Sequence, residues 1–340
     1  MTRPKLAIIN SDPKDFAYGG VAPIMRNMHP ALEKAFDISY FYLPDSWKRL
    51  PLPGRARVLL YIRSCRSRLK NFDFILSHIP EGSYAVASLG VPFAHIYHGN
   101  TNPMVVSKYW FGKYFRGVFE SFFRTIEQKA ALRYTVGPVW EGVRKLVNPI
   151  RHSVTPVPLS ERRGFIYAGR LENGKNIDRI IRLYARLSDE ERAANPLTIA
   201  GTGTLEAYLK TLAAQLGIAG NVCFTGMMPN AELVKLDSHQ RLLLMASDFE
   251  GFPTAIAEAM TLGVPVVTTD VGDIPRFIRD GVNGRMLKPG FSDEEYIAAI
   301  HSVLADYDRY AAAALETGRI FDADTITGEI IADIKKIIGR

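Results

Sequence analysis

Two carboxylates, Glu250 and Glu258, flank a Gly-Phe-Pro bend in residues 247–267, SDFEGFPTAIAEAMTLGVPVV. Proline suits the first turn of a helix because its missing N–H would have no intrahelical partner there, so Pro253 predicts a helix that begins at this bend. Glu250 then lies on the loop before the helix, and Glu258 lies a little over one turn inside it. The free backbone N–H groups of the first turn, from Thr254 onward, attract anions. This arrangement suits a ligand with both phosphates and hydroxyls, such as a nucleotide sugar.

The flanking sequence places this bend at the edge of a parallel sheet. LLLMAS before the bend and GVPVVTTD after it each predict a buried strand, and strand, loop, helix and strand make one unit of such a sheet. Ligands of these sheets bind at the C-terminal ends of the strands, where the Glu250 loop would lie. Without these flanks, a solvated loop residue and a helix-surface residue would be the simpler interpretation of the two acids.

A pair of cations follows another strand. In AGRLENGKNI, Arg170 comes just after the apolar run GFIYA, and Lys175 comes five residues later, before a helix. Arginine offers a planar fork and lysine a point charge, so the pair suits a diphosphate. Two solvated basic residues on a loop are the alternative, and the nearby acidic pair favours the diphosphate.

Glycines mark two further loops. AGTGTL places Gly201 and Gly203 at a strand end, and YGGVAP places Gly19 and Gly20 between the first strand and the first helix. Glycine lets the backbone approach a ligand closely, but a tight turn explains either motif equally well.

The elements that must position these residues repeat a strand–helix pattern in each half. Short apolar strands alternate with helical stretches before residue 148 and again after residue 164, which predicts two α/β, Rossmann-like, doubly wound domains with parallel sheets. The Pro-rich stretch 148–164 supplies the linker. We expect domains at 1–155 and 156–320, and a C-terminal helix within 321–340.

Composition restricts the class of protein. The 340 residues suit two domains, and the chain has no run of 18 apolar residues that would predict a membrane span. Cys65 and Cys223 match no metal or disulfide pattern, and the N-terminus predicts a strand where a signal peptide would stand, so we expect a cytoplasmic protein. Residues 1–155 hold 22 Lys and Arg but 10 Asp and Glu, which predicts an anionic partner for the first domain.

The segments EGFPTAIAEAM and GVPVVTTDVG together resemble the donor-site signature of the retaining family 4 glycosyltransferases. The resemblance is strong over residues 164–290 and weaker before them. It implies the GT-B fold, in which two Rossmann-like domains face each other across a cleft. It also implies that no metal or other cofactor is required, because cations stabilise the departing diphosphate.

The resemblance assigns a role to individual residues. It implies that Arg170 and Lys175 bind the diphosphate, that Glu258 binds the ribose hydroxyls, and that Glu250 faces the transferred sugar. His98, at the end of a predicted strand, would contact the donor sugar; His78 ends the preceding strand and is the weaker candidate, while His95 is expected in the core. The remaining donor-binding positions would contribute mainly backbone: Gly19, Gly20, Gly201, Gly203, Met227, Gly251, Phe252, Pro253, Thr254 and Ala255.

One segment departs from the family pattern. Where the family often has G-G-x-x-E, this chain has V-G-D-I-P-R, with Asp273 in place of the second glycine and Arg276 in place of the glutamate. The chemistry implied by the other residues is unaffected, but the specificity is less certain.

Two basic segments of the first domain suggest the acceptor. Residues 47–70 carry eight Lys or Arg and no acid, and residues 108–124 interleave aromatic and basic side chains. Such surfaces suit peripheral contact with an anionic membrane, although the aromatics could equally fill the core. Single-stranded nucleic acid is a third possibility, but it would leave the nucleotide-sugar site without a purpose. We therefore expect no nucleic-acid partner.

The sequence thus predicts a retaining, metal-independent hexosyltransferase at the cytoplasmic face of the cell membrane. It would use a nucleoside diphosphate sugar, with a UDP-sugar favoured and GDP-mannose next, and a hydroxyl of a cell-surface glycan or lipid-linked acceptor. A GT-B phosphorylase, a sugar-nucleotide epimerase and a non-catalytic nucleotide-sugar-binding module remain alternatives.

Overall fold

The computed structural model describes residues 2–10, 22–98, 116–137, 139–152, 154–251 and 253–339, without the side chains of residues 22, 23, 116, 118 and 119. The expected site residues Gly19, Gly20 and Phe252 lie outside the described residues. The chain forms two compact units, Met1–Pro149 with Ala323–Arg340 and Ile150–Asp322. The first boundary falls six residues before the expected 155/156, and the second falls two residues after 320/321.

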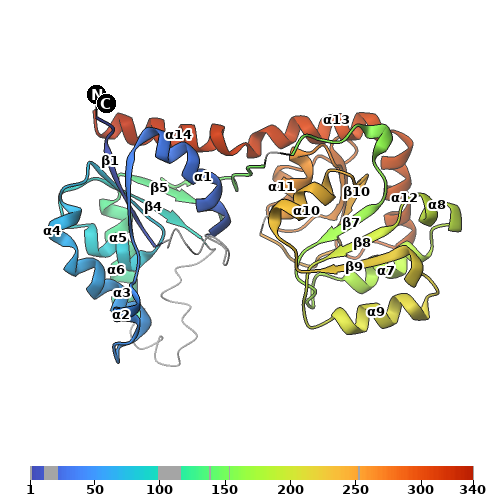
Figure 1. Cartoon of the computed structure of the whole chain (residues 1–340), viewed down its shortest axis with the longest axis horizontal. Coiled ribbons are helices and arrows are strands. Elements are labelled where there is room, and N and C mark those ends of the chain that lie inside the picture. Colours follow the sequence, from blue (N-terminus) through green and yellow to red (C-terminus); the bar gives the residue numbers. More distant parts are fainter. Residues whose placement is uncertain are drawn as a thin grey trace. The chain divides into compact units, whose positions relative to one another are not determined.

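The first unit contains a parallel sheet of six strands in the order β2-β1-β3-β4-β5-β6 among the residues described (Figure 1). Its strands are β1 (Lys5–Ile9), β2 (Asp37–Phe41), β3 (Phe74–Ser77), β4 (Phe93–Tyr97), β5 (Leu132–Thr135) and β6 (Arg144–Lys145). This is a doubly wound order, and the connections change direction between β1 and β3.

Both faces of this sheet are buried, which explains why its central strands β1, β3 and β4 are mostly apolar. Leu6 and Ile8 of β1 pack in one hydrophobic cluster, and the alternate residues Ala7 and Ile9 pack in another. Successive side chains of a strand point to opposite faces, so a strand covered on both sides is apolar at every position.

Helices cover the two faces of the first sheet. They are α1 (Ala22–Ala35), α2 (Asp45–Lys48), α3 (Gly54–Ser64), α4 (Arg66–Leu69), α5 (Pro80–Val86), α6 (Arg116–Lys129) and α14 (Ala323–Ile337). Helix α14 joins this unit from the far end of the chain. Its Ile326, Ile330 and Ile334 are spaced to lie on one side of the helix and enter the core, and the Tyr134 hydroxyl donates to Asp333 at 2.7 Å.

The second unit contains a parallel sheet in the order β12-β11-β10-β7-β8-β9. Its strands are β7 (Phe165–Ala168), β8 (Leu197–Ala200), β9 (Val222–Gly226), β10 (Leu242–Leu244), β11 (Val266–Thr269) and β12 (Gly284–Leu287). The chain builds outward from β7 to β9, returns to β10 on the other side of β7, and continues to β12. This is the Rossmann order, and its switch point lies between β7 and β10.

Seven α-helices of the described chain surround the second sheet. They are α7 (Ile177–Ala185), α8 (Asp189–Ala194), α9 (Glu206–Gln215), α10 (Asn230–Asp237), α11 (Thr254–Thr261), α12 (Asp293–Ala305) and α13 (Tyr307–Gly318). Short 3₁₀ turns complete the chain at Leu159–Glu161, Ala219–Asn221, Ile274–Arg276 and Arg319–Phe321. None of the helices that the structure describes has the length and apolarity needed to cross a bilayer.

Candidate functional site

The switch point of the second sheet brings three of the expected site residues to one edge. Arg170 and Lys175 follow β7, and Glu250 follows the neighbouring strand β10. In an open α/β sheet the crevice outside the strand ends at this point is where ligands bind. The register of β7 against β10 therefore gathers residues that are 75 or more positions apart in the chain.

Lys175 and Glu250 form a partly buried ion pair. The Lys175 Nζ lies 2.6 Å from Glu250 Oε1, and their side chains are 17% and 9% exposed. Glu250 Oε1 also accepts a hydrogen bond from Ser247 Oγ at 2.8 Å. The ammonium has three protons and uses one here, so two remain for an anionic ligand. Glu250 Oε2 accepts nothing from the residues that the structure describes, and it can receive a ligand hydroxyl.

A second layer holds Glu250 in place. Ser247 is 1% exposed, and its carbonyl accepts a hydrogen bond of 2.6 Å from the Thr269 hydroxyl at the end of β11. The chain Thr269–Ser247–Glu250 therefore fixes the carboxylate from the neighbouring strand. Ser247 and Thr269 were not predicted as site residues from the sequence. The one feature that could have pointed to them is that each is a polar residue at the end of a buried apolar run.

Asn176 ties the two loops of the switch point together. Its side-chain amide donates to the Ala246 carbonyl at 2.9 Å and to Asp248 Oδ1 at 2.7 Å. Its φ of 52° is left-handed, a conformation that asparagine tolerates better than most residues. Because Lys175 precedes Asn176 in the chain, these two hydrogen bonds fix the position from which the Lys175 ammonium reaches Glu250. Asn176 was also missed from the sequence.

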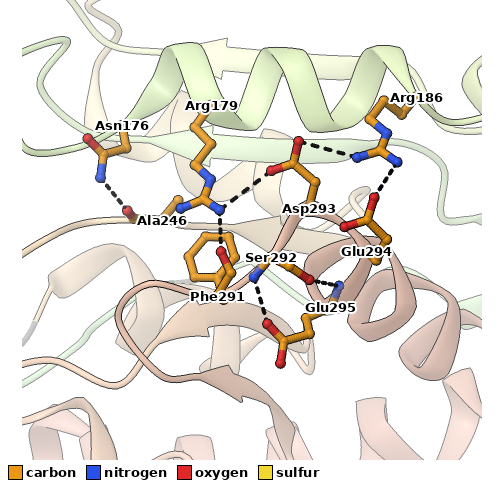
Figure 2. Close-up of polar contacts among 9 residues, drawn as sticks. All are labelled: Asn176, Arg179, Arg186, Ala246, Phe291, Ser292, Asp293, Glu294 and Glu295. Carbon is orange, nitrogen blue, oxygen red and sulfur yellow. Dashed lines mark hydrogen bonds and ion pairs between the residues drawn. The ribbon is translucent and has the colours of Figure 1, made fainter.

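Helix α7, which starts directly after Asn176, is fastened to helix α12 (Figure 2). Arg186 bridges Asp293 at 3.3 Å and Glu294 at 2.7 Å, and Arg179 bonds the Phe291 carbonyl. Both acids belong to the first turn of α12, where negative charge is favourable. This contact restrains α7, and with it the Lys175 loop that precedes the helix.

Arg170 is exposed at the same sheet edge. Its carbonyl accepts a hydrogen bond of 3.0 Å from the buried Tyr167 hydroxyl, which orients the loop. Burial is the main cause that raises the pKa of Tyr167, followed by the nearby Glu250 charge, so the phenol stays a donor. No hydrogen bond or ion pair engages the Arg170 guanidinium within the described part of the chain. The guanidinium is therefore available to a ligand at this sheet edge.

The helix after the bend begins one residue later than the sequence predicted. Pro253 is the N-cap residue of α11 and precedes the first turn, which starts at Thr254. The amide of Ile256 donates to the Pro253 carbonyl at 3.1 Å, so it is not a free donor. Within the described residues the amides of Thr254 and Ala255 find no backbone acceptor, and these two remain as anion-binding candidates.

Glu258 lies half-buried on α11 and accepts a hydrogen bond of 2.8 Å from Asn230, the first residue of α10. The last residue of α10, Asp237, is 1% exposed, and its Oδ1 has no partner among the residues described. Burial, and then the charge of Glu258, raises the pKa of Asp237 well above its usual range. The surroundings of Asp237, Glu258 among them, therefore favour its protonated form, and neither Asn230 nor Asp237 was identified from the sequence.

Gly201 and Gly203 lie where the packing of two loops leaves no room for a side chain. A Cβ on Gly201, whose φ is 137°, would lie 1.9 Å from the Gly169 carbonyl oxygen, and one on Gly203 would lie 2.3 Å from that of Leu171. Both glycines thus let the loop after β8 press against the loop after β7. Their contact with a nucleotide stays a prediction, as does that of Met227, which is 74% exposed after β9, and of Gly251, whose carbonyl accepts from the Asp273 amide.

In the first unit, His78 and His98 meet at the corresponding sheet edge. They follow the adjacent strands β3 and β4, and His78 Nδ1 lies 2.9 Å from His98 Nε2. His95 is 1% exposed inside β4, where its Nδ1 bonds the Ser83 hydroxyl at 2.7 Å. The described residues contain no group of three or more His, Cys, Asp or Glu side chains arranged to hold a metal ion.

The second unit is similar to known glycosyltransferases. Residues 156–318 match the family model of the glycosyl transferases group 1. An uncharacterized glycosyltransferase of Methanocaldococcus jannaschii is 32% identical over 43% of this chain and 37% of its own length. The lipopolysaccharide 1,6-galactosyltransferase of Salmonella typhimurium is 29% identical over 50% of this chain and 48% of its own length. The chain thus spans less than half the length of these curated relatives.

Solved structures extend the likeness to both units. The apo form of the lipopolysaccharide outer core galactosyltransferase WaaB matches 98% of this chain and 99% of its own, with a TM-score of 0.68 and 17% identity. HepE of Anabaena in complex with UDP matches 98% of this chain and 100% of its own, with the same TM-score and identity. The expected fold class, α/β with two Rossmann-like domains of the GT-B type, is confirmed.

Proposed function

We propose that this chain is a retaining, metal-independent glycosyltransferase of family 4 that transfers a hexose from a nucleoside diphosphate sugar. The observation that supports this most is the Lys175–Glu250 pair at the Rossmann switch point, with Arg170 beside it on the same edge. The match of this unit to the group 1 glycosyltransferases agrees with the proposal. The neighbouring HepE structures contain UDP and UDP-glucose, which favours a UDP-sugar over GDP-mannose as donor.

In the proposed reaction, two cations act on the diphosphate. Arg170 and Lys175 stabilise the negative charge that grows on the departing phosphate, the role that a metal ion plays elsewhere. Glu250 Oε2 receives a hydroxyl of the transferred sugar and stabilises positive charge at the anomeric carbon. The departing phosphate takes the acceptor proton, so Glu250 is not required as a base. Glu258 holds the ribose hydroxyls.

We further propose that the acceptor is a hydroxyl of a cell-surface glycan or of a lipid-linked glycan at the cytoplasmic face of the membrane. Three leucines of the basic segment 47–70 are exposed, namely Leu50, Leu52 and Leu60 at 39%, 40% and 42%. Exposed Lys48, Arg49, Arg63, Arg66, Arg68 and Lys70 belong to the same segment. Apolar side chains with basic neighbours suit an anionic bilayer surface.

The second aromatic and basic segment, 108–124, carries less of this proposal. Residues 108–115 lie outside the described chain, and the Phe122 ring stacks on Tyr84 with centroids 3.8 Å apart. Phe123 packs near Tyr97, with ring centroids 5.6 Å apart. These aromatics serve packing inside the first unit, so the membrane proposal rests on residues 47–70.

A nucleotide panel tests the donor site. Melting temperatures of the wild type, Glu258→Ala and a control, Glu190→Ala on the surface of α8, are measured with UDP-, GDP-, ADP- and dTDP-sugars. We expect one nucleotide series to raise the melting temperature of the wild type and the control and to act less on Glu258→Ala. No shift with any series would contradict the proposal.

Product analysis tests the reaction. NMR of the product from a membrane-lipid or glycan acceptor should show the anomeric configuration of the donor, and excess EDTA should leave the rate unchanged. Donor epimerisation without acceptor, or sugar phosphate release that requires phosphate, would identify the other enzyme classes. Nucleotide binding without any turnover would favour a binding module.

Flotation with anionic vesicles tests the membrane contact. We expect the wild type to float with the vesicles, and we expect a variant with Leu50→Ser, Leu52→Ser and Leu60→Ser to lose this binding. Equal flotation of both proteins would contradict the membrane contact.

A further inference from the structure

The two histidines at the edge of the first sheet form a hydrogen-bonded pair. His78 Nδ1 and His98 Nε2 are 2.9 Å apart, the ring centroids are 5.1 Å apart and the ring planes are inclined by 26°. An imidazole N–H and the opposing lone pair both lie in the ring planes, so near-coplanar rings at this separation suit one N–H···N bond. The strand register of β3 against β4 places the rings there.

One hydrogen bond between two neutral imidazoles couples their tautomers. If His78 Nδ1 carries the proton and donates, His98 Nε2 is bare and the proton of His98 lies on Nδ1. If His98 Nε2 donates, His78 Nδ1 is bare and its proton lies on Nε2. Both rings are therefore Nδ1–H tautomers in one state and Nε2–H tautomers in the other. In either state the two outer nitrogens offer one donor and one acceptor.

The outer nitrogens have unused hydrogen-bonding capacity. His78 Nε2 and His98 Nδ1 are buried, and neither has a partner among the residues that the structure describes. The His78 side chain is 4% exposed, and a buried polar atom without a partner costs stability. Burial lowers the pKa of His98 to about 4, and burial with the charges of His98 and His95 lowers that of His78, so both rings are neutral near pH 7.

We propose that His78 is a positioning residue that sets the tautomer of His98, and that the pair binds sugar hydroxyls through its two outer nitrogens. A hydroxyl donates one proton and accepts another, so a ligand with several hydroxyls can match either state, and binding selects one of them. This inference rests on the proposed glycosyl transfer for its ligand class. The coupling of the tautomers follows from the geometry of the pair alone.

Nitrogen NMR of the full chain labelled with ¹⁵N-histidine tests the coupling without any assay of activity. We expect the His78 and His98 rings to be neutral near pH 7 and to share one tautomer, or to exchange together between the two. Opposite tautomers, or a protonated ring, would overturn the proposal. Ser83→Ala serves as the control, because it alters the partner of His95 and leaves the pair in place.

Addition of UDP-glucose or GDP-mannose to the labelled chain tests hydroxyl binding. The sugar that binds should shift the outer nitrogens and drive both rings to one tautomer. Binding that leaves His78 Nε2 and His98 Nδ1 unchanged would overturn the ligand assignment. If neither sugar nor any nucleotide of the panel binds, the proposed function fails, whereas the spectrum of the free chain still decides the coupling.

Kinetics separate positioning from structural support. His78→Leu removes the hydrogen bond to His98 and should lower kcat/KM by about tenfold, the effect of one such bond. The amide of His78→Asn reaches the place of Nδ1 and can donate or accept, so it should recover most of this loss. His78→Gln, whose amide reaches the place of Nε2, should not recover it. Equal losses in all three variants at unchanged melting temperature would contradict the positioning role.

Discussion

Two sites of this protein lie at the C-terminal ends of adjacent parallel strands but differ in their electrostatics. At the second sheet, a lysine and a glutamate form a charged pair with Ser247 as an additional donor. At the first sheet, one hydrogen bond joins two neutral imidazoles, and their outer nitrogens lack partners among the residues described. Both sites follow adjacent parallel strands, so the architecture alone does not determine the chemistry.

The difference corresponds to two kinds of ligand group. Fixed charges at a partly buried edge interact strongly with a charged diphosphate and require counter-charges when no ligand is bound. Neutral donors and acceptors cost less to bury and suit uncharged hydroxyls. Under the two proposals above, the charged edge suits phosphates and the neutral pair suits uncharged hydroxyls.

Removal of the lysine should produce the largest effect. Lys175→Met keeps most of the side-chain volume but takes away the charge, and we expect kcat to fall by about 10²-fold, as for the loss of one preorganised transition-state contact. Lys210→Met is the matched control, because Lys210 pairs with Glu206 on the surface of α9. Steady-state rates and melting curves are measured for both variants. A similar loss of kcat in both would mean that the loss comes from impaired folding and not from the site.

Glu258→Ala should weaken nucleotide binding by about tenfold, because a charge-assisted hydrogen bond to a ribose hydroxyl contributes roughly 1.5–3 kcal/mol at most. Calorimetric titration of the nucleoside diphosphate measures the change. Because Glu258 interacts with ground state and transition state alike, kcat at saturating donor should change much less. A fall in kcat with unchanged affinity would exclude the ribose role.

Asn176→Ala should lower kcat/KM by about three- to tenfold through a misplaced Lys175, since the ammonium keeps its charge but loses the contact that fixes its loop. Asp248→Ala removes only one of the two acceptors of Asn176 and is the milder comparison. If Asn176→Ala is as active as the wild type, the loop contact does not position the lysine.

Asp237→Asn should have the smallest effect, and that effect should be on stability. The pKa of Asp237 is higher in the folded chain than in the unfolded chain. The contribution of this carboxyl to the stability of the fold is therefore fully present below the unfolded pKa, and it is lost as the pH rises through the folded pKa. We expect the variant to be more stable than the wild type near neutral pH by about 1 kcal/mol, or about 2–4 °C.

The gain of Asp237→Asn should vanish toward pH 4. In a Glu258→Gln background the gain should be smaller, because the Glu258 charge contributes to the raised pKa. Melting curves across this pH range measure both differences. A gain that does not depend on pH would contradict the raised pKa of Asp237.

The sequence contained enough to predict the fold class and the group of residues at the second sheet. Arg170, Lys175 and Glu250 each follow a continuous apolar run that clearly predicts a buried strand. In a parallel sheet the C-terminal ends of the strands lie at the same edge, which brings these residues together. The short strands β5, β6 and β12 were not predicted. LRYT, RK and GRML lie at or next to a sheet edge, and each contains a charged residue, so they lack the continuous apolar run of a strand buried on both faces.

The supporting residues could not be predicted for a different reason. Thr269 and Asn176 donate to carbonyls of the loop after β10 at 2.6 and 2.9 Å, and Ser247 donates to Glu250 within that loop at 2.8 Å. The residue types around these three positions contain no sign of those contacts. Likewise, His78 and His98 are 20 positions apart, and only the strand register shows that they touch.

The measurement that tests the central claim most directly is a titration with phosphates of different length. With the base identified by the nucleotide panel, the nucleoside diphosphate and monophosphate are titrated into the wild type, Lys175→Met and Lys210→Met. We predict that the wild type and Lys210→Met prefer the diphosphate by about tenfold or more, and that Lys175→Met loses most of this preference. An unchanged preference in Lys175→Met would contradict the assignment of the diphosphate to the edge of the second sheet.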